Sequence, residues 1–160
     1  MSQSLKAERF RALHQGPLFV LPNPWDAGSA RILASMGFAA LATTSAGLAF
    51  SLGRRDAESA VSRDEALANA SAIIAATDLP VSADLENGYG DAPEDAALTI
   101  RLAAEVGLVG GSIEDATGDA TRPIYDFEHA VERVAAAAEA AHTLPFPFTF
   151  VARAENFLPG

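Results

Sequence analysis

The sequence contains no cysteine, one tryptophan and few basic side chains. The absence of cysteine excludes a disulfide framework, a cysteine-ligated zinc site and a thiol nucleophile. Only 11 Lys and Arg stand against 21 Asp and Glu, a formal charge of −10, which argues against nucleic acid or an anionic membrane as a partner. No uncharged run reaches the roughly 20 apolar residues of a membrane span, and the polar start is unlike a signal peptide. We therefore expect a cytoplasmic protein.

The 160 residues, 49% apolar and 20% charged, suit one globular domain. After an N-terminal helix at about 3–14, short apolar segments alternate with helical patterns that end at glycine, as at Gly37 and Gly107. This alternation predicts a parallel α/β sheet with right-handed crossovers. Strands are expected at 17–24, 38–45, 79–86, 108–115 and 146–155, with helices at about 26–36, 63–76, 93–106 and 127–141. The S-x-x-E spacing of Ser62 and Glu65 predicts a capping box at the start of the second of these helices.

Charged residues gather where these expected strands end. Asp84 and Glu86 end the third strand, Glu114 the fourth and Arg153 the fifth. In parallel α/β proteins the chemistry lies at this carboxyl edge, and residues two apart on a strand share a face. Converging carboxylates with no cysteine and no histidine on these strands favour Mg²⁺ or Mn²⁺. The alternative is a set of helix-capping or surface acids.

Two further features have two interpretations each. Residues 43–47 form a small, polar segment whose backbone N–H groups could hold a carboxylate or phosphate, or they form an ordinary turn. Arg153 lies inside an apolar strand, where an unpaired charge is costly. It therefore needs a protein carboxylate, such as Glu114 or Glu155, or a bound anionic substrate. Trp25, beside the end of the first expected strand, either lines a pocket or packs.

Five segments, read in order, resemble the isocitrate lyase/phosphoenolpyruvate mutase superfamily: LPNPWDAGSAR, ATTSAGLAFSLGRRD, VSADLENGYGDAPEDA, GGSIEDATGD and FVARAENF. The resemblance implies a TIM-type (β/α) barrel, of which residues 1–160 would form one partial domain with five of eight strand–helix units. It also implies a homo-oligomeric, Mg²⁺-dependent lyase-type enzyme. Such an enzyme makes or breaks a C–C or P–C bond next to a small 2-oxo or 2-hydroxy carboxylate through an enolate-like species.

The same resemblance implies roles for individual residues. Asp84 would ligate the metal directly, and Glu86, Glu114 and Asp56 would hold it largely through water. Substrate binding is implied for six residues: Trp25, Thr43, Ser45, Ala46, Gly47 and Arg153. Of these metal and substrate residues, Arg153, Asp56 and Glu114 are the expected catalytic residues.

The sequence departs from the lyase branch in one loop. That branch carries K-K-C-G-H with an acid/base cysteine, whereas residues 116–127 read ATGDATRPIYDF. Cleavage by a thiol acid is therefore not expected, and Asp119, Arg122 and Tyr125 are candidates for a lid. Alternatives are decarboxylation or hydrolysis of an oxaloacetate-like substrate, or a truncated, non-catalytic paralogue, because a complete barrel needs about 250 residues. A nucleotide-binding domain is disfavoured because no phosphate-loop motif is present.

Overall fold

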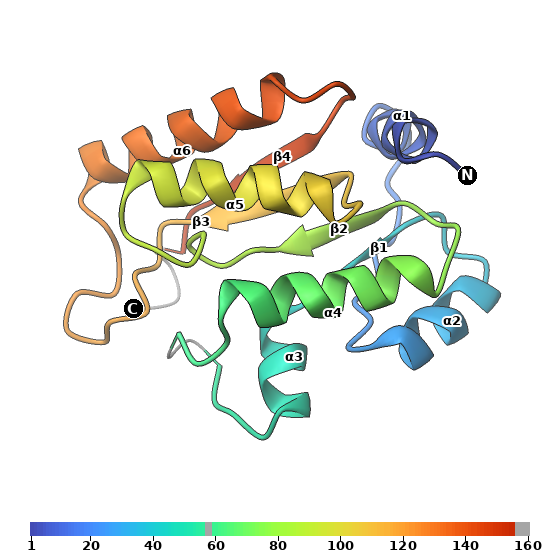
Figure 1. Cartoon of the computed structure of the whole chain (residues 1–160), viewed down its shortest axis with the longest axis horizontal. Coiled ribbons are helices and arrows are strands. Elements are labelled where there is room, and N and C mark those ends of the chain that lie inside the picture. Colours follow the sequence, from blue (N-terminus) through green and yellow to red (C-terminus); the bar gives the residue numbers. More distant parts are fainter. Residues whose placement is uncertain (57–58, 156–160) are drawn as a thin grey trace.

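The computed structural model describes residues 1–56 and 59–155. They form a four-stranded parallel sheet of order β1-β2-β3-β4, with helices between the strands (Figure 1). The predicted α/β class is confirmed. No helix in these two ranges is both long and apolar enough to cross a lipid bilayer. The elements are α1 (Gln3–Leu13), α2 (Ala27–Ser35), β1 (Leu41–Ala42), α3 (Ser45–Ser51), α4 (Arg63–Ala75), β2 (Val81–Asp84), α5 (Pro93–Glu105), β3 (Gly110–Glu114), α6 (Phe127–His142) and β4 (Thr149–Arg153).

Local capping fixes where two of the helices begin. The Asp26 side chain accepts a hydrogen bond from Ser29 N (2.7 Å) at the start of α2. At the start of α4, Ser62 Oγ accepts from Glu65 N (3.3 Å), and Glu65 Oε2 accepts from Ser62 N (2.9 Å). These bonds satisfy N–H groups that have no partner within the helix. The capping box predicted from the Ser62–Glu65 spacing is confirmed.

The expected first strand at 17–24 is wrong, because the structure assigns no strand there. The segment runs beside β1, where Pro22 O accepts from Ala42 N (3.1 Å) and Asn23 Nδ2 donates to Ala42 O (3.1 Å). Three of its eight residues are proline. Proline has no N–H to donate, so a regular ladder does not extend along this segment.

The turn expected at residues 43–47 is also corrected, because a helix begins within it. Thr44 is the N-cap of α3, and its Oγ1 accepts from Gly47 N (3.2 Å). The helix is only seven residues long, too short for hydrophobic periodicity to distinguish it from a loop. The sequence pattern therefore does not predict this helix in the long segment between β1 and α4.

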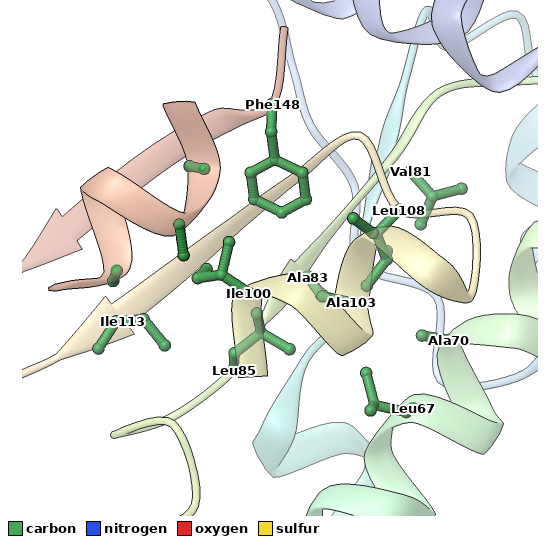
Figure 2. Close-up of a cluster of buried hydrophobic side chains, with 14 of the residues drawn as sticks. Leu67, Ala70, Val81, Ala83, Leu85, Ile100, Ala103, Leu108, Ile113 and Phe148 are labelled. Atoms are coloured by element: carbon green, nitrogen blue, oxygen red, sulfur yellow. The ribbon is translucent and has the colours of Figure 1, made fainter. Parts of the chain in front are cut away.

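The main core lies between the sheet and helices α4, α5 and α6, which run along one face of the sheet (Figure 1). Its buried side chains are aliphatic apart from Phe148, and many of them are alanine, so helices and sheet pack closely. Figure 2 labels members from α4, α5, β2, β3 and the residues that flank the strands: Leu67, Ala70, Val81, Ala83, Leu85, Ile100, Ala103, Leu108, Ile113 and Phe148. A second cluster joins Phe10 of α1 to Ala40 and Val109.

The parallel register brings the ends of the strands together. Asp84, the last residue of β2, pairs with Ser112 of β3, and Glu114 at the end of β3 pairs with Arg153 at the end of β4. Helix α1 lies toward the opposite end, where Gln3 Nε2 donates to Ala104 O (2.7 Å) and Leu108 O (3.0 Å). The carboxyl edge of the sheet is thus left to charged side chains.

Candidate functional site

Asp84 is the centre of the polar contacts at the carboxyl edge. Its Oδ2 accepts from Ser45 Oγ (2.8 Å) and Ser45 N (3.3 Å), which ties β2 to the first turn of α3. Its Oδ1 accepts from Arg153 (3.2 Å) and from Glu86 N (3.2 Å). The backbone N–H of Asp84 donates to Thr43 Oγ1 (3.2 Å). The carboxylate is therefore oriented by groups from three strand ends.

Arg153 lies among three carboxylates. Its guanidinium is 3.2 Å from Asp84 Oδ1 and 3.3 Å from Glu114 Oε2, and it also donates to Glu155. Asp115 in turn accepts from Glu155 N (2.8 Å). Of the two partners considered from sequence, the structure shows the protein carboxylates. They give a half-buried arginine the compensation that a buried charge requires.

Glu86 does not lie on the strand, contrary to the alternation argument, because β2 ends at Asp84. It adopts φ +48°, a left-handed conformation that is unusual for a residue other than glycine. Its backbone is fixed on both sides, since Glu86 N donates to Asp84 Oδ1 (3.2 Å) and Glu86 O accepts from Glu114 N (2.9 Å). Backbone strain of this kind concentrates at functional sites. Glu114, by contrast, does lie on its strand, where it shares a face of β3 with Ser112 two residues earlier.

Two glutamates at this edge hold protons more tightly than usual. Burial, reinforced by Asp84 and Asp56, raises the pKa of Glu86 from 4.5 to about 7. Burial also raises the pKa of Glu114 to about 7; Arg153 opposes that rise, and Asp84, Glu155 and Glu86 add to it. Crowded, partly desolvated carboxylates resist ionising together. A cation at this edge would relieve that cost.

A cleft of about 390 Å³ opens beside these groups. It brings together five of the predicted site residues: Ser45, Asp56, Glu86, Glu114 and Arg153. The residues 116–124, whose ends meet in the Ala116–Ile124 bridge, supply a largely apolar wall. The other lining residues are Ser59, Asn87, Ala116, Gly118, Asp119, Ala120, Pro123, Ile124 and Glu155.

The remaining predicted residues lie next to this cleft but do not line it. Thr43 is buried and supports Asp84 from below, and both line a small neighbouring cavity. Trp25, 52% exposed, packs on Gly47, where an added Cβ would lie 2.5 Å from the indole Cδ1. Ala46 lies between Ser45 and Gly47 in the first turn of α3. Their roles in substrate binding stay predictions.

Of the three lid candidates, only Asp119 lines the cleft. Its Oδ1 accepts from Thr121 N and Oγ1, both at 2.8 Å, which shapes the loop tip. Tyr125 is buried, and its hydroxyl donates to Asp91 Oδ1 (2.6 Å) and accepts from Asn87 Nδ2 (3.0 Å). Tyr125 therefore supports the loop that carries Asn87 and Asp91 and is not a lid residue. Arg122 does not reach the cleft wall.

Residues 10–160 match the family model described as phosphoenolpyruvate phosphomutase. The chain belongs to the PEP mutase/isocitrate lyase superfamily. The resemblance inferred from the five sequence segments is thus confirmed.

Solved structures agree with this family. A candidate lyase/mutase from Burkholderia cenocepacia J2315 is 62% identical, with a TM-score of 0.95 over 99% of this chain and 56% of that chain. A 2,3-dimethylmalate lyase of the superfamily is 30% identical, with a TM-score of 0.86 over 96% of this chain and 55% of that chain. An oxaloacetate acetylhydrolase in complex with its product oxalate is 27% identical, with a TM-score of 0.88 over 98% and 55%. This chain spans about half the length of each, so it covers about half of a TIM-barrel chain of the family.

The donor set at the carboxyl edge fits the metal that the superfamily resemblance implies. Asp84, Glu86, Glu114 and Asp56 offer only oxygen, which suits Mg²⁺ or Mn²⁺. Within 1–56 and 59–155, no three Asp, Glu or His side chains are grouped closely enough to ligate one ion. These residues fit a divalent cation through the type of their donor atoms, because they supply carboxylate oxygens near adjacent strand ends. Two of these carboxylates, Glu86 and Glu114, have a raised pKa.

Two contributors were missed or underrated from sequence. Asn87 lines the cleft directly after Glu86, and its position at a strand end was the available signal. Arg133 of α6 contacts the loop that carries both residues. Its signal was spacing, because residues 133, 137, 140 and 141 share the buried side of α6.

Proposed function

We propose that this chain carries the metal- and anion-binding residues of a Mg²⁺-dependent, lyase-type enzyme of the superfamily. The reaction would make or break a C–C or P–C bond next to a small 2-oxo or 2-hydroxy carboxylate. The observation that carries this proposal is the cluster at the carboxyl edge: Asp84, Glu86 and Glu114 with Arg153 beside a cleft of about 390 Å³. Asp84, Glu86, Glu114 and Asp56 are the residues proposed to hold the cation.

The cation, when bound, would stabilise negative charge developing on a substrate oxygen. Arg153 is the one cationic side chain among the described residues that line the cleft. Its proposed role is to bind the substrate anion, exchanging part of its contact with Asp84 and Glu114 for the substrate. Ser45, in the first turn of α3, offers an N–H and a hydroxyl beside Asp84 for the substrate carboxylate. Such preorganised donors stabilise charge without rearranging during the reaction.

Hydrolysis or decarboxylation of an oxaloacetate-like substrate is the second candidate. It is favoured by the loop 116–126, whose cleft-lining residues include neither cysteine nor lysine nor histidine. The likeness to an oxaloacetate acetylhydrolase that binds oxalate points the same way. Because this chain spans about half of its relatives, a non-catalytic binding module is the third possibility, and homo-oligomerisation is proposed only from the superfamily.

The first test is calorimetric titration with oxalate, a planar mimic of the enolate of a 2-oxo acid, with and without Mg²⁺. We expect binding that requires Mg²⁺ and weakens by at least on the order of 100-fold in Asp84→Ala, a metal-binding candidate. Asp84→Asn keeps the shape of the side chain while removing its charge. Asp78→Ala is the matched control, because the Asp78 side chain is 87% exposed and, among the described residues, its ion pair is with the N-terminus.

Oxalate binding that does not depend on Mg²⁺, or that is unchanged in Asp84→Ala, would contradict the proposed role of Asp84 in holding the cation. With binding established, product analysis separates the two reactions. Oxalate and acetate from oxaloacetate indicate hydrolysis, pyruvate and CO₂ indicate decarboxylation, and aldehyde or ketone release from a 2-hydroxy acid indicates the lyase. Binding without turnover of any of these substrates would favour the non-catalytic module.

A further inference from the structure

Arg133 is a charged side chain buried in the middle of α6. It is 1% exposed, although it belongs to a helix of exposed charges and small apolar residues. Its partners within the described chain are carbonyl oxygens and an aromatic ring rather than a carboxylate. Burying a guanidinium without an ion pair is costly, and an apolar side chain would fill the same place at less cost. The hydrogen bonds of Arg133 therefore call for an explanation.

Those hydrogen bonds all reach the loop that joins β2 to α5. Arg133 donates to Gly90 O (2.8 Å) and Ala92 O (3.2 Å), and it also donates to Asp91 O and Asn87 O. The two ends of the loop are thus held by one planar group. A guanidinium can do this because its N–H donors point in fixed, diverging directions.

Tyr125 contacts polar side chains of the same loop. The Arg133 guanidinium lies 4.4 Å from the centre of the Tyr125 ring, a cation–π contact. The Tyr125 hydroxyl donates to Asp91 Oδ1 and accepts from Asn87 Nδ2. Arg133 and Tyr125 therefore fix both the backbone and the polar side chains that follow Glu86.

The loop needs such support because its backbone is strained. Glu86 (φ +48°) and Tyr89 (φ +59°) are left-handed, as is Gly88 (φ +85°) between them. Non-glycine residues keep this conformation only where surrounding contacts impose it. Gly88 O accepts further bonds from Thr99 Oγ1 (2.7 Å) and Arg63 (3.1 Å). The loop is held from both sides, and Glu86 and Asn87 face the cleft.

We propose that Arg133 is a positioning residue, which holds the β2–α5 loop in its strained conformation and thereby sets the affinity of the carboxyl-edge site for a divalent cation. This inference rests on the proposed function, because it assumes that Glu86 helps to hold the cation. Arg133 touches neither substrate nor cation in this account. It acts through the backbone of residues 87–92.

The test compares Arg133→Lys and Tyr125→Phe with wild type in two measurements. Calorimetry with MgCl₂ gives cation affinity, and hydrogen exchange of the amides of residues 86–92 reports loop order without any metal. Lysine keeps the charge but cannot span both ends of the loop. We expect Mg²⁺ affinity to fall by on the order of 10-fold or more in Arg133→Lys and loop exchange to accelerate. Tyr125→Phe keeps the ring under Arg133 and should show a smaller change in the same direction.

Ile73→Val, a fully buried core substitution in α4, is the control for general loss of stability. It should leave both Mg²⁺ affinity and loop exchange unchanged. Unchanged exchange in Arg133→Lys and Tyr125→Phe, or unchanged Mg²⁺ affinity despite faster exchange, would overturn the positioning role while leaving the proposed function intact. Wild-type protein that binds no Mg²⁺ would overturn the proposed function, and the role in cation affinity with it.

Discussion

The two ends of the sheet differ in composition: the amino end is apolar and buried, whereas the carboxyl end carries charged side chains. At the amino end, Leu108 and Val109 lead into β3, and both are fully buried: Leu108 packs in the main core, and Val109 packs with Phe10 of α1. At the carboxyl end, the same strands finish in Asp84, Glu114 and Arg153. Apolar packing stabilises the first end, whereas the second keeps charges close together and a strained loop beside them. Stability and chemistry are therefore separated along the strands, and substitutions at the two ends should behave differently.

The largest effect is expected at the amino end. Leu108→Ala removes a fully buried side chain and leaves a cavity in the main core, which should lower the free energy of unfolding by roughly 2–5 kcal/mol. Denaturant unfolding monitored by circular dichroism measures this loss. If the variant stays folded, its oxalate affinity should match wild type, and a selective loss of affinity would show that the two ends are not separable.

A smaller effect is expected at the start of α4, on the carboxyl side of the sheet, where Ser62 lines a cavity together with Glu86 and Asn87. Ser62→Ala removes the N-cap of α4, where Ser62 Oγ accepts from Glu65 N, and should cost about 1 kcal/mol of stability. The same unfolding experiment measures it. Ser62→Asn, which keeps a capping oxygen, is the control and should recover most of the loss. Equal stability of Ser62→Ala and wild type would refute the capping role.

An effect of the opposite sign is expected at Glu86, at the carboxyl end. The pKa of Glu86 rises from 4.5 to about 7 on folding, chiefly through burial. The folded state therefore keeps a proton that the unfolded state loses, so stability falls as pH rises from 4.5 through 7. Glu86→Gln removes this charge. Without divalent cations it should be more stable than wild type at pH 8 and show a shallower decline above pH 5.

Thermal melts across this pH range test that expectation. Glu65→Gln is the contrasting control, because its hydrogen bonds with Arg54, followed by those with Ser62, lower the pKa of Glu65 to about 2. It should lose stability at neutral pH rather than gain it. If Glu86→Gln were less stable than wild type at pH 8, the view that crowded carboxylates destabilise this edge would be wrong.

The sequence predicted the regular parts of the molecule better than the irregular ones. The Ser62–Glu65 pair located the start of α4, and Gly107 located the end of α5, because capping and glycine C-caps act locally. The prediction of a strand at 17–24 was wrong because it followed the apolar residues of the segment, whereas its three prolines prevent a regular ladder. Helix α3 was missed because seven residues carry too little periodic signal.

The site was predicted at the level of residue types and strand ends. Neighbouring parallel strands had to bring Asp84, Glu114 and Arg153 together, and they do. The left-handed turn at Glu86 and the contacts of Arg133 depend on tertiary packing, which pattern reasoning does not see. A buried arginine in particular looks like a surface residue until its helix neighbours are known.

The most direct test of the account is the free energy of unfolding of wild-type protein at pH 8, measured against MgCl₂ with NaCl at matched ionic strength. If the crowded carboxyl edge is a divalent-cation site, stability should rise with Mg²⁺, by about 2.7 kcal/mol when Mg²⁺ reaches 100 times its dissociation constant. Asp84→Ala should not show the rise. Equal stability in Mg²⁺ and in matched NaCl would contradict the central claim that this edge is built to hold a cation.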